Sequence, residues 1–356
     1  MQSAGSQKGQ VSQWYAGLDV FKLFFAVCVV AIHTYLTDAL PEPAAFWIQQ
    51  SVFRLAVPFF FVASGFLLGK KLHGKDETPW PVLRGFIGRL IPPLLCIGTA
   101  NGLLELLLGR LRQGTIKRSM LVRFVKNMLF YPYGAMWYIY ACIVGALLLY
   151  PFLKRRKLGH ALLIGALLYV WALLCNNYYF AAQGLGIDRW VKRYMELFVS
   201  GRNGLFVGAF WLALGIGTYE WHRADGKTWP LKLGLAVCWI LYLAEIYLLK
   251  EKPYLDDRAL YIMQIPLVPL IVLNVLKLRL PITRAASLLM RKASVWLYFS
   301  HRLIYILGRI PWYLAFREEW RGMGAFIVVT AVSMATFAAA GSGRAKTGER
   351  HDFRQV

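Results

Sequence analysis

The stretch LDVFKLFFAVCVVAIHTYL, residues 18–36, decides the fold, because it is long and apolar enough to cross a bilayer. It nevertheless contains Lys22 and His33. At ~100° and 1.5 Å per residue, the two side chains lie within roughly 20° of the same helix face and ~16 Å apart along the axis. A stripe with polar groups at both depths is typical of a bundle interior or a pathway.

The whole chain has the composition of an integral membrane protein. It has 356 residues, of which 58% are hydrophobic and 17% charged. Its near-continuous apolar runs argue against a soluble core, and it lacks the short alternating segments of an outer-membrane barrel. We therefore predict an all-α fold, a polytopic membrane bundle of about ten transmembrane helices.

Apolar runs predict the positions of these spans and two amphipathic segments. The segment 111–130 is too charged to span and predicts a helix at the membrane interface, and 179–201 is similarly mixed. The predicted spans are residues 17–36, 45–69, 83–109, 134–153, 159–178, 202–220, 230–249, 259–276, 292–311 and 323–341.

The spans predict one membrane domain with short polar ends. The domain is expected over residues 17–341, between a cytoplasmic N-terminal segment, 1–16, and a disordered cytoplasmic tail, 342–356. The N-terminal segment has no cleavable signal, so the first span is expected to remain.

The net charge of +23 fits membrane orientation better than nucleic-acid binding, because the basic residues lie in short loops and in the tail. Their modest bias predicts that both termini are cytoplasmic. The five cysteines lie in or beside apolar segments without a CxxC pair, so neither a disulfide nor a metal site is expected.

Several basic residues fall inside or beside the predicted spans. Arg54 lies at about the depth of His33, and a guanidinium inside a span needs an anionic or carbonyl partner. Arg84 and Arg89 lie at the cytoplasmic boundary of the third span. They either follow positive-inside topology or form a phosphate-binding mouth.

On the outer side, Trp137 and Tyr138 begin the fourth span, where aromatic residues are usually interfacial. Arg202 and Asn203 begin the sixth span between two glycines. Backbone donors and a side-chain fork at a helix N-terminus can hold an oxygen-rich group, so these two residues are candidate ligands for a substrate.

The ninth span carries a second histidine, His301, followed by Arg302. His301 is either satisfied by neighbouring hydroxyl groups or part of a reaction site. Glu105 and Glu245 are isolated acids in the third and seventh spans and are candidate partners for the buried bases. The chain contains no P-loop, GxSxG or HExxH motif.

At these residues the chain resembles the acyltransferase-3 family of integral-membrane acyltransferases. The resemblance covers about residues 15–341 and is carried by five features: Lys22 and His33 as a basic-x10-His signature, FFF-x-x-SGF at 59–66, Arg89 before Leu-Ile-Pro, Trp137-Tyr138, and Tyr298-x-x-His301. The family's usual first-helix arginine is Lys22 here, which cannot make a bidentate contact. The family often has a closer arginine pair near Arg89, whereas the nearest arginine here is Arg84.

Within the family, the chain is similar to the membrane module of the vancomycin-resistance serine racemases. The shared segments are FRLAVPFFF (53–61), GRNGLF (201–206) and WLYFSH (296–301). In those proteins a soluble racemase domain follows the module. This sequence shows none, so we expect no racemase activity.

The resemblance implies an O-acyltransferase of the bacterial inner membrane. It would move an acyl group, expected to be acetyl, from cytoplasmic acyl-CoA to a hydroxyl of an extracytoplasmic glycan or other cell-envelope molecule. His33 is implied as the general base or acyl relay, Arg54 as the group that polarises the acyl carbonyl, and His301 as a second catalytic residue. The expected substrate-binding residues are Lys22, Arg84 and Arg89 for the donor, and Trp137, Tyr138, Arg202 and Asn203 near the acceptor.

Two other readings of the sequence remain open. In a membrane transport module for a small amino acid such as serine, the same polar stripe would line the path, and Arg54 or Arg202 would bind the carboxylate. A structural scaffold would leave the charges inside the membrane unexplained.

Overall fold

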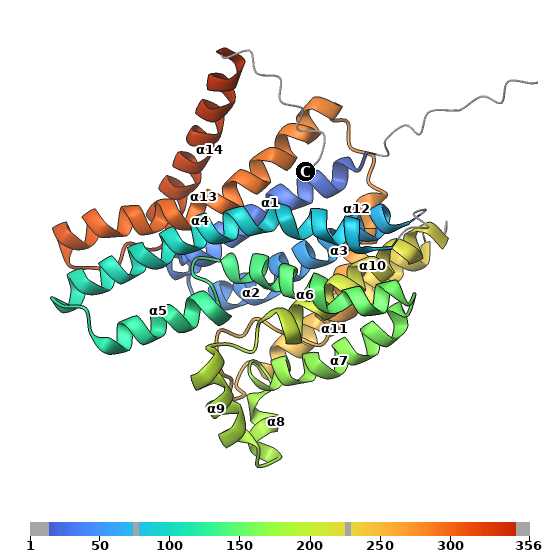
Figure 1. Ribbon diagram of the computed structural model, residues 1–356, viewed down its shortest axis with the longest axis horizontal. Helices are drawn as coiled ribbons and strands as arrows, with labels where there is room; N and C mark the ends of the chain where they lie inside the picture. Colours follow the sequence, from blue (N-terminus) through green and yellow to red (C-terminus); the bar gives the residue numbers. More distant parts are fainter. Residues whose placement is uncertain (1–13, 74–77, 225–228, 347–356) are drawn as a thin grey trace, which may run out of the picture.

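The structure, a computed structural model, describes residues 14–73, 78–224 and 229–346, and in these residues it contains helices and no β-strand (Figure 1). The predicted all-α fold is confirmed. In chain order, with short 3-10 or π turns marked η, the helices are α1 (Ala16–His33), η1 (Leu36–Ala39), α2 (Ala44–Ser51), η2 (Phe53–Leu55), α3 (Ala56–Leu72), α4 (Trp80–Gln113), α5 (Arg118–Phe130), α6 (Met136–Lys154), α7 (Leu158–Leu174), α8 (Tyr179–Gly184), α9 (Asp188–Phe198), η3 (Gly204–Gly208), α10 (Ala209–Ala224), α11 (Trp229–Leu249), α12 (Gln264–Leu276), α13 (Arg284–Phe316) and α14 (Met323–Lys346).

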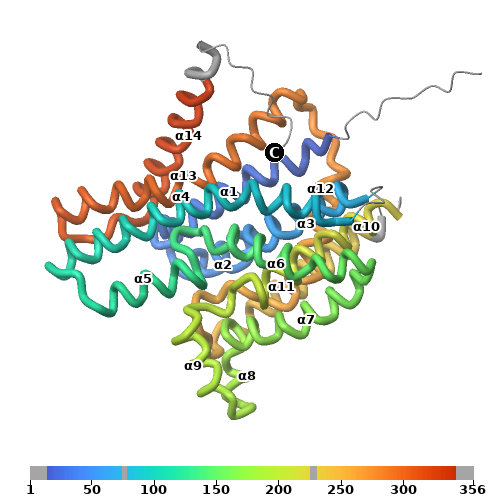
Figure 2. The backbone as a smooth tube through the Cα atoms, viewed as in Figure 1, coloured from blue at the N-terminus to red at the C-terminus, as the bar shows by residue number. Residues whose placement is uncertain are grey.

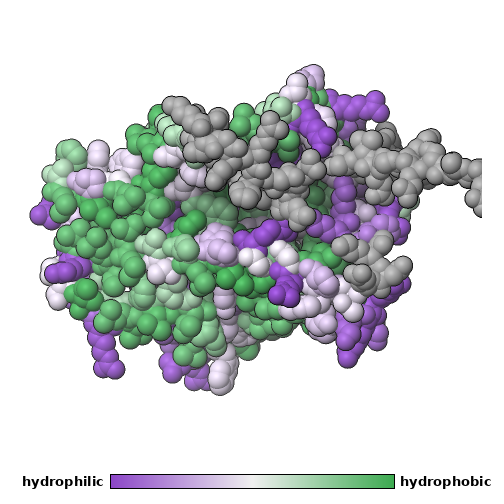
Figure 3. Space-filling model, turned by 45° about the horizontal axis from the view of Figure 1, so that its top comes forward, coloured by the Kyte–Doolittle hydropathy of each residue, from purple (hydrophilic) through white to green (hydrophobic). Residues whose placement is uncertain are grey.

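Six helical stretches of the described chain are long and apolar enough to cross a membrane, and α7 and α12 are shorter apolar helices. Hydrophobic side chains cover most of the face seen in Figure 3, and hydrophilic side chains lie mainly along its right-hand, left-hand and lower edges. The protein is therefore a helical membrane protein. The six long stretches are Ala16–His33, Ala44–Leu72, Trp80–Gln113, Met136–Lys154, Leu231–Leu249 and Met323–Gly341.

The second predicted span, 45–69, is not one regular helix. It breaks after α2, passes through the turn η2 and resumes as α3, so that Arg54 lies in the break. Pro58 then falls in the first turn of α3, where a missing backbone N–H costs nothing. The side-chain amide of Gln264 donates to the carbonyl oxygen of Arg54 over 3.3 Å. The break is therefore compensated by tertiary contacts.

Other boundaries also differ from the prediction. Helix α12 begins at Gln264 instead of residue 259, α13 begins at Arg284 instead of 292, and α14 continues to Lys346, into the segment predicted as a tail. The side chain of Asn176 accepts hydrogen bonds from the backbone N–H groups of residues 259 and 260 and holds this segment outside the helix. The remaining predictions for 1–13 and 347–356 lie outside the described residues.

Contacts between helices agree with a chain in which successive spans cross the membrane in opposite directions, so that odd-numbered spans are parallel. Helices α1 and α13, the predicted first and ninth spans, run in the same direction, because Asp19 pairs with Arg291 near their starts and His33 lies beside His301 farther along. The backbone trace in Figure 2 shows α4 following α13 closely. One end of the bundle thus collects His33, His301 and the C-terminal part of α4.

A close helix crossing joins α3 and α10 at Gly65 and Gly215. A Cβ atom added at Gly65 would meet the carbonyl oxygen of Leu212 and lie 2.9 Å from the Cα of Gly215. Small residues allow such close backbone approach, and packing of this kind stabilises helix pairs in lipid. This contact fixes α3, and therefore the turn that carries Arg54.

We predict that Gly65→Leu destabilises the protein by roughly 2 kcal/mol or more, because overpacking against backbone cannot be relieved by a rotamer change. The measurement is thermal unfolding in detergent. Gly88→Leu is the matched control, because the space around Gly88 on the exposed side of α4 is open. Equal melting temperatures for the two variants would contradict the proposed packing.

Candidate functional site

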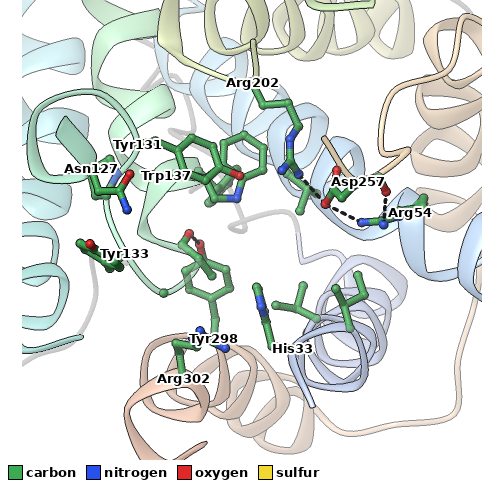
Figure 4. Close-up of a pocket in the computed structure, with 17 residues that line it drawn as sticks. His33, Arg54, Asn127, Tyr131, Tyr133, Trp137, Arg202, Asp257, Tyr298 and Arg302 are labelled. Atoms are coloured by element: carbon green, nitrogen blue, oxygen red, sulfur yellow. Dashed lines mark hydrogen bonds and ion pairs between the residues drawn. The ribbon is translucent and has the colours of Figure 1, made fainter. Parts of the chain in front are cut away.

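A cavity of about 250 Å³ lies at the end of the bundle where α1 finishes (Figure 4). It is bounded by α1, the η2 turn, the end of α5, the segment before α6, the loop before α12, and α13. The predicted residues His33, Arg54, Trp137, Tyr138 and Arg202 all line it. The other lining residues are Val29, Ile32, Val57, Asn127, Tyr131, Pro132, Tyr133, Gly134, Ala135, Asp257, Tyr298 and Arg302.

The two membrane histidines lie side by side. His33 is the last residue of α1, is half-buried and faces the cavity, whereas His301 is fully buried on α13. Their ring centroids are 5.3 Å apart. Nδ1 of His301 donates to the carbonyl oxygen of Leu297 over 3.0 Å, and its buried Nε2 has no hydrogen-bond partner among the described residues. The accessible imidazole of His33 therefore packs against the buried imidazole of His301, whose orientation is fixed by its hydrogen bond.

Arg54 and Arg202 share one carboxylate. Nη1 of each guanidinium lies 3.0 Å from Oδ2 of Asp257. Arg54 also donates to the backbone carbonyl of Asp257, and Arg202 forms a two-pronged pair with Asp256 at 3.0 and 3.1 Å. Ser200 donates to the same Asp256 carboxylate over 2.7 Å. Two cations and two anions thus compensate one another at the rim of the bundle.

The ion pairs affect the titration of Asp257. Burial raises the pKa of its carboxyl, but the guanidinium groups of Arg202 and Arg54 lower that pKa by a larger amount. The net result is a pKa below the usual range. Asp257 therefore keeps its charge at neutral pH. Asp257 can therefore hold both arginines at the cavity throughout the physiological pH range.

Aromatic rings support the Arg202 guanidinium from the cavity side. Its central carbon lies 5.2 Å from the ring centroid of Trp137 and 5.5 Å from that of Tyr131. The two rings stack on one another with centroids 5.6 Å apart. Trp137 thus contacts a paired cation through its π face, a contact that an interfacial belt residue would not need.

Two tyrosines join the elements around the cavity. The Tyr298 hydroxyl donates to the carbonyl oxygen of Ala135. The Tyr138 hydroxyl lies 2.9 Å from Oγ of Ser64 and donates to the carbonyl oxygen of Phe60 over 3.1 Å. Together these hydrogen bonds join α13, α6 and α3 around the cavity and fix the helices that line it.

Glu105 is paired with two arginines of α13. It accepts hydrogen bonds from Arg302 over 2.7 Å and from Arg309 over 3.2 Å, and Arg309 also pairs with Glu319 at 3.0 Å. Because Arg302 lines the cavity, Glu105 sets the position of a third guanidinium at the site. The other isolated acid, Glu245, instead accepts from Tyr178 and from two backbone N–H groups at the start of α12.

The three predicted donor-binding residues lie away from this cavity. Lys22 lies three turns before His33 on α1, and the nearby carboxylate of Asp19 binds Arg291 and Ser287 at 2.5 to 2.9 Å. Arg84 and Arg89 are exposed near the start of α4. The structure does not bring these three residues together with His33.

Asn203 has a local structural contact set. Its side-chain oxygen accepts hydrogen bonds from the backbone N–H groups of Leu205 and Phe206, both over 3.1 Å, and its amide donates to the Tyr194 hydroxyl over 2.7 Å. It therefore caps η3 and does not line the cavity. Among the described residues, no group of three His, Cys, Asp or Glu side chains could hold a metal ion.

Sequence reasoning did not single out Asp256, Asp257, Tyr131, Asn127 or the role of Arg302 in the cavity. One signal was present: the chain has 18 acidic residues against 41 basic ones, and two acids are adjacent in the loop before α12. An acidic pair in a strongly basic membrane protein is a candidate partner for arginines within spans. Its partners could not be read from the sequence, since Asp257 and Arg54 are 203 residues apart.

Comparison with known proteins gives one family match and three significant curated relatives. A family model described as an acyltransferase domain, of acyltransferase-3 type, matches residues 15–340. An amino-acid racemase of Enterococcus faecalis is 28% identical over 206 residues, which are 56% of this chain and 27% of that protein. A serine/alanine racemase of Enterococcus gallinarum is 28% identical over 208 residues, 56% of this chain and 28% of that protein. The chain therefore matches less than a third of the length of these relatives. No solved structure has a significant match.

We predict that Asp257→Asn destabilises the protein at neutral pH by about 1–2 kcal/mol, less than for a fully enclosed pair because the carboxylate is partly open to solvent. The contribution of Asp257 is complete above its unfolded pKa of about 4 and is lost as the pH falls through its lower folded pKa. Melting temperatures in detergent between neutral and acid pH should therefore fall less steeply for Asp257→Asn than for the native protein.

The control for this variant is Asp188→Asn, which removes a surface pair with Lys192 in α9. Its melting temperature should stay close to that of the native protein, since surface pairs contribute little. An Asp257→Asn protein with native stability and native acid dependence would show that the two arginines do not need this carboxylate.

Proposed function

This chain belongs to the acyltransferase-3 family of membrane proteins, and from that premise we propose that it is an O-acyltransferase of the bacterial inner membrane. The donor is acyl-CoA, with acetyl as the expected group, bound from the cytoplasm. The acceptor is a hydroxyl of an extracytoplasmic glycan or other envelope molecule. The observation that carries the proposal is a half-buried histidine on the wall of a cavity lined by three arginines.

His33 is suited to act as the general base. In the proposed step its imidazole takes the proton of the acceptor hydroxyl while the hydroxyl oxygen attacks the thioester carbonyl carbon. The carbon–sulfur bond then breaks, and the thiolate leaves with coenzyme A and takes a proton from the imidazolium. His301, whose Nδ1 is fixed by the Leu297 carbonyl, packs beside the His33 ring and is proposed to keep it in place.

The negative charge that develops on the carbonyl oxygen needs a cationic neighbour. Arg302 is the best placed candidate, because it lines the cavity, lies next to His301 in the chain and is oriented by Glu105. Arg54 also lines the cavity, and its buried Nε has no hydrogen-bond partner among the described residues. We propose that these two guanidinium groups polarise the acyl carbonyl, while Arg202 is held mainly by its carboxylates.

Lys22, Arg84 and Arg89 are proposed to bind the phosphates of the donor at the other end of the bundle. Their distance from His33 supports this assignment, because a donor and an acceptor on opposite sides of a membrane need separate binding regions. Arginine side chains suit phosphate oxygens, and Lys22 adds a point charge.

A second candidate function is transport of a small amino acid such as serine. It is favoured by one observation, the similarity to proteins named amino-acid racemase and serine/alanine racemase. In this reading Arg54 and Arg302 would bind the carboxylate of the amino acid in the same cavity. Uptake of labelled serine into proteoliposomes, without an acyl donor, would favour transport over transfer.

We predict that His33→Ala lowers acyl transfer from acetyl-CoA by roughly 10²–10⁴-fold in the purified, reconstituted protein, because a general base contributes about that factor. The measurement is release of coenzyme A and incorporation of labelled acetyl into envelope material. His160→Ala is the control, because His160 is exposed at the start of α7. Transfer at the native rate by His33→Ala would refute the catalytic role.

For the donor site, we predict that Arg84→Gln combined with Arg89→Gln raises the KM for acetyl-CoA roughly tenfold or more, since a hydrogen bond to a charged group contributes about 1.5–3 kcal/mol. The value of kcat should change little, because both residues lie far from the reacting atoms. Lys154→Gln with Arg155→Gln, two exposed residues at the end of α6, is the charge-matched control. A drop in kcat with an unchanged KM would place the two arginines elsewhere in the reaction.

A further inference from the structure

A second, larger hollow lies beside the cavity, between α5 and α9. Its volume is about 790 Å³. In Figures 1 and 2 both helices lie toward the lower left, at the end of the bundle reached by the C-terminal part of α4. Lys126 of α5 donates to the carbonyl oxygen of Glu196 in α9 over 2.8 Å, and the rings of Phe130 and Phe198 lie 5.1 Å apart, edge to face. These contacts join the two helices and leave the hollow between them, here called the α5–α9 groove.

The α5–α9 groove adjoins the cavity of His33 through one residue. Asn127, near the end of α5, lines both spaces. Its buried Oδ1 has no hydrogen-bond partner among the described residues. Figure 4 shows the Asn127 side chain at the edge of the cavity, near Tyr131 and Tyr133. A molecule bound in the groove would therefore have one end next to the reaction site and a polar atom available to receive it.

The groove is basic. Arg118, Arg123 and Lys126 line it, against a single acid, Glu196. Glu196 already pairs with Arg193 at 3.1 Å. Arg118 and Arg123 are exposed and form no ion pair within the part of the chain that the structure describes. A cluster of uncompensated cations of this kind attracts anions and raises their local concentration.

The arrangement of α5 separates the groove from the lipid. Met120, Phe124 and Met128 face α4, where they approach Gly102 and Gly109. A second face carries exposed apolar side chains suited to lipid: Leu121, Val125 and Leu129.

Arg123 lies on neither of these faces. It is two residues from both Leu121 and Val125, which places it roughly 160° around the helix from each. It therefore points into the groove and away from the apolar face. Arg118, seven residues before Val125, does lie on the side of the apolar face, where arginines that bind lipid headgroups are expected, whereas Arg123 does not.

We propose that the acceptor of this protein carries an anionic group, a carboxylate or a phosphate, and that it binds in the α5–α9 groove with its hydroxyl directed past Asn127 toward His33. This inference rests on the proposed function for the identity of the acceptor. The binding itself needs no acyl transfer, so the two can fail separately.

The test measures binding of soluble probes to the full protein in discs of phosphatidylcholine. The anionic probes are hexagalacturonate and a short glycerol-phosphate oligomer, and the neutral probe is maltohexaose. We expect the anionic probes to bind at least about tenfold more tightly at low salt, and the difference to shrink at high salt. Arg118→Glu combined with Arg123→Glu should abolish the preference.

The matched control is Lys154→Glu with Arg155→Glu, which makes the same change in net charge at the far end of α6 and should keep the preference. Gel filtration and melting temperature check that both variants are folded. If a variant in the groove is unfolded, Arg123→Gln, which removes a single exposed charge, replaces it, with a weaker preference as the expected result.

Two results would overturn the proposal. One is equal binding of anionic and neutral probes by the native protein. The other is a preference that survives Arg118→Glu with Arg123→Glu; weaker association of that variant with discs containing phosphatidylglycerol would then make the groove a site for lipid headgroups. An absence of His33-dependent acyl transfer alongside selective anion binding would refute only the proposed function.

Discussion

The structure depends on the pairing of charges that lie in or beside an apolar bundle. An unpaired guanidinium in such surroundings is costly, so each arginine at the cavity has a carboxylate partner. Asp257 serves Arg54 and Arg202, and Glu105 serves Arg302. The pairs connect elements that are far apart in sequence, and they leave the guanidinium groups facing a shared space. The same ion pairs thus offset the cost of burying the arginines and set the positions of their guanidinium groups at the cavity.

Much of the architecture could be predicted from the sequence. A run of about 20 apolar residues is a strong local signal, and each predicted span has a helical counterpart. The prediction that Arg54 lies at about the depth of His33 agrees with the structure, in which both residues line the cavity. Pro58 indicates a kink or a helix start near this point of the span, but the path of the chain through η2 could not be predicted. The break exists because Gln264 and Asp257, distant in sequence, satisfy the Arg54 backbone and side chain.

The candidate site was harder to predict for a related reason. A basic residue in a span shows that a partner is needed, but not which of several acids supplies it. Glu105 and Glu245 looked alike in sequence, yet one binds two arginines and the other caps the start of α12. Asn203 looked like a ligand and caps η3 instead. Helical periodicity gives depth and face, whereas packing alone determines which polar groups meet.

The shared carboxylate of Asp257 also has an evolutionary consequence. A neutral residue at this position would leave Arg54 without a carboxylate partner and Arg202 with Asp256 alone, and a neutral replacement at Arg54 or Arg202 would leave an excess anion. Tolerated changes at these positions therefore have to occur together. Across related sequences, positions 54, 202, 256 and 257 should vary as a correlated set, although no two adjacent helices contain them all.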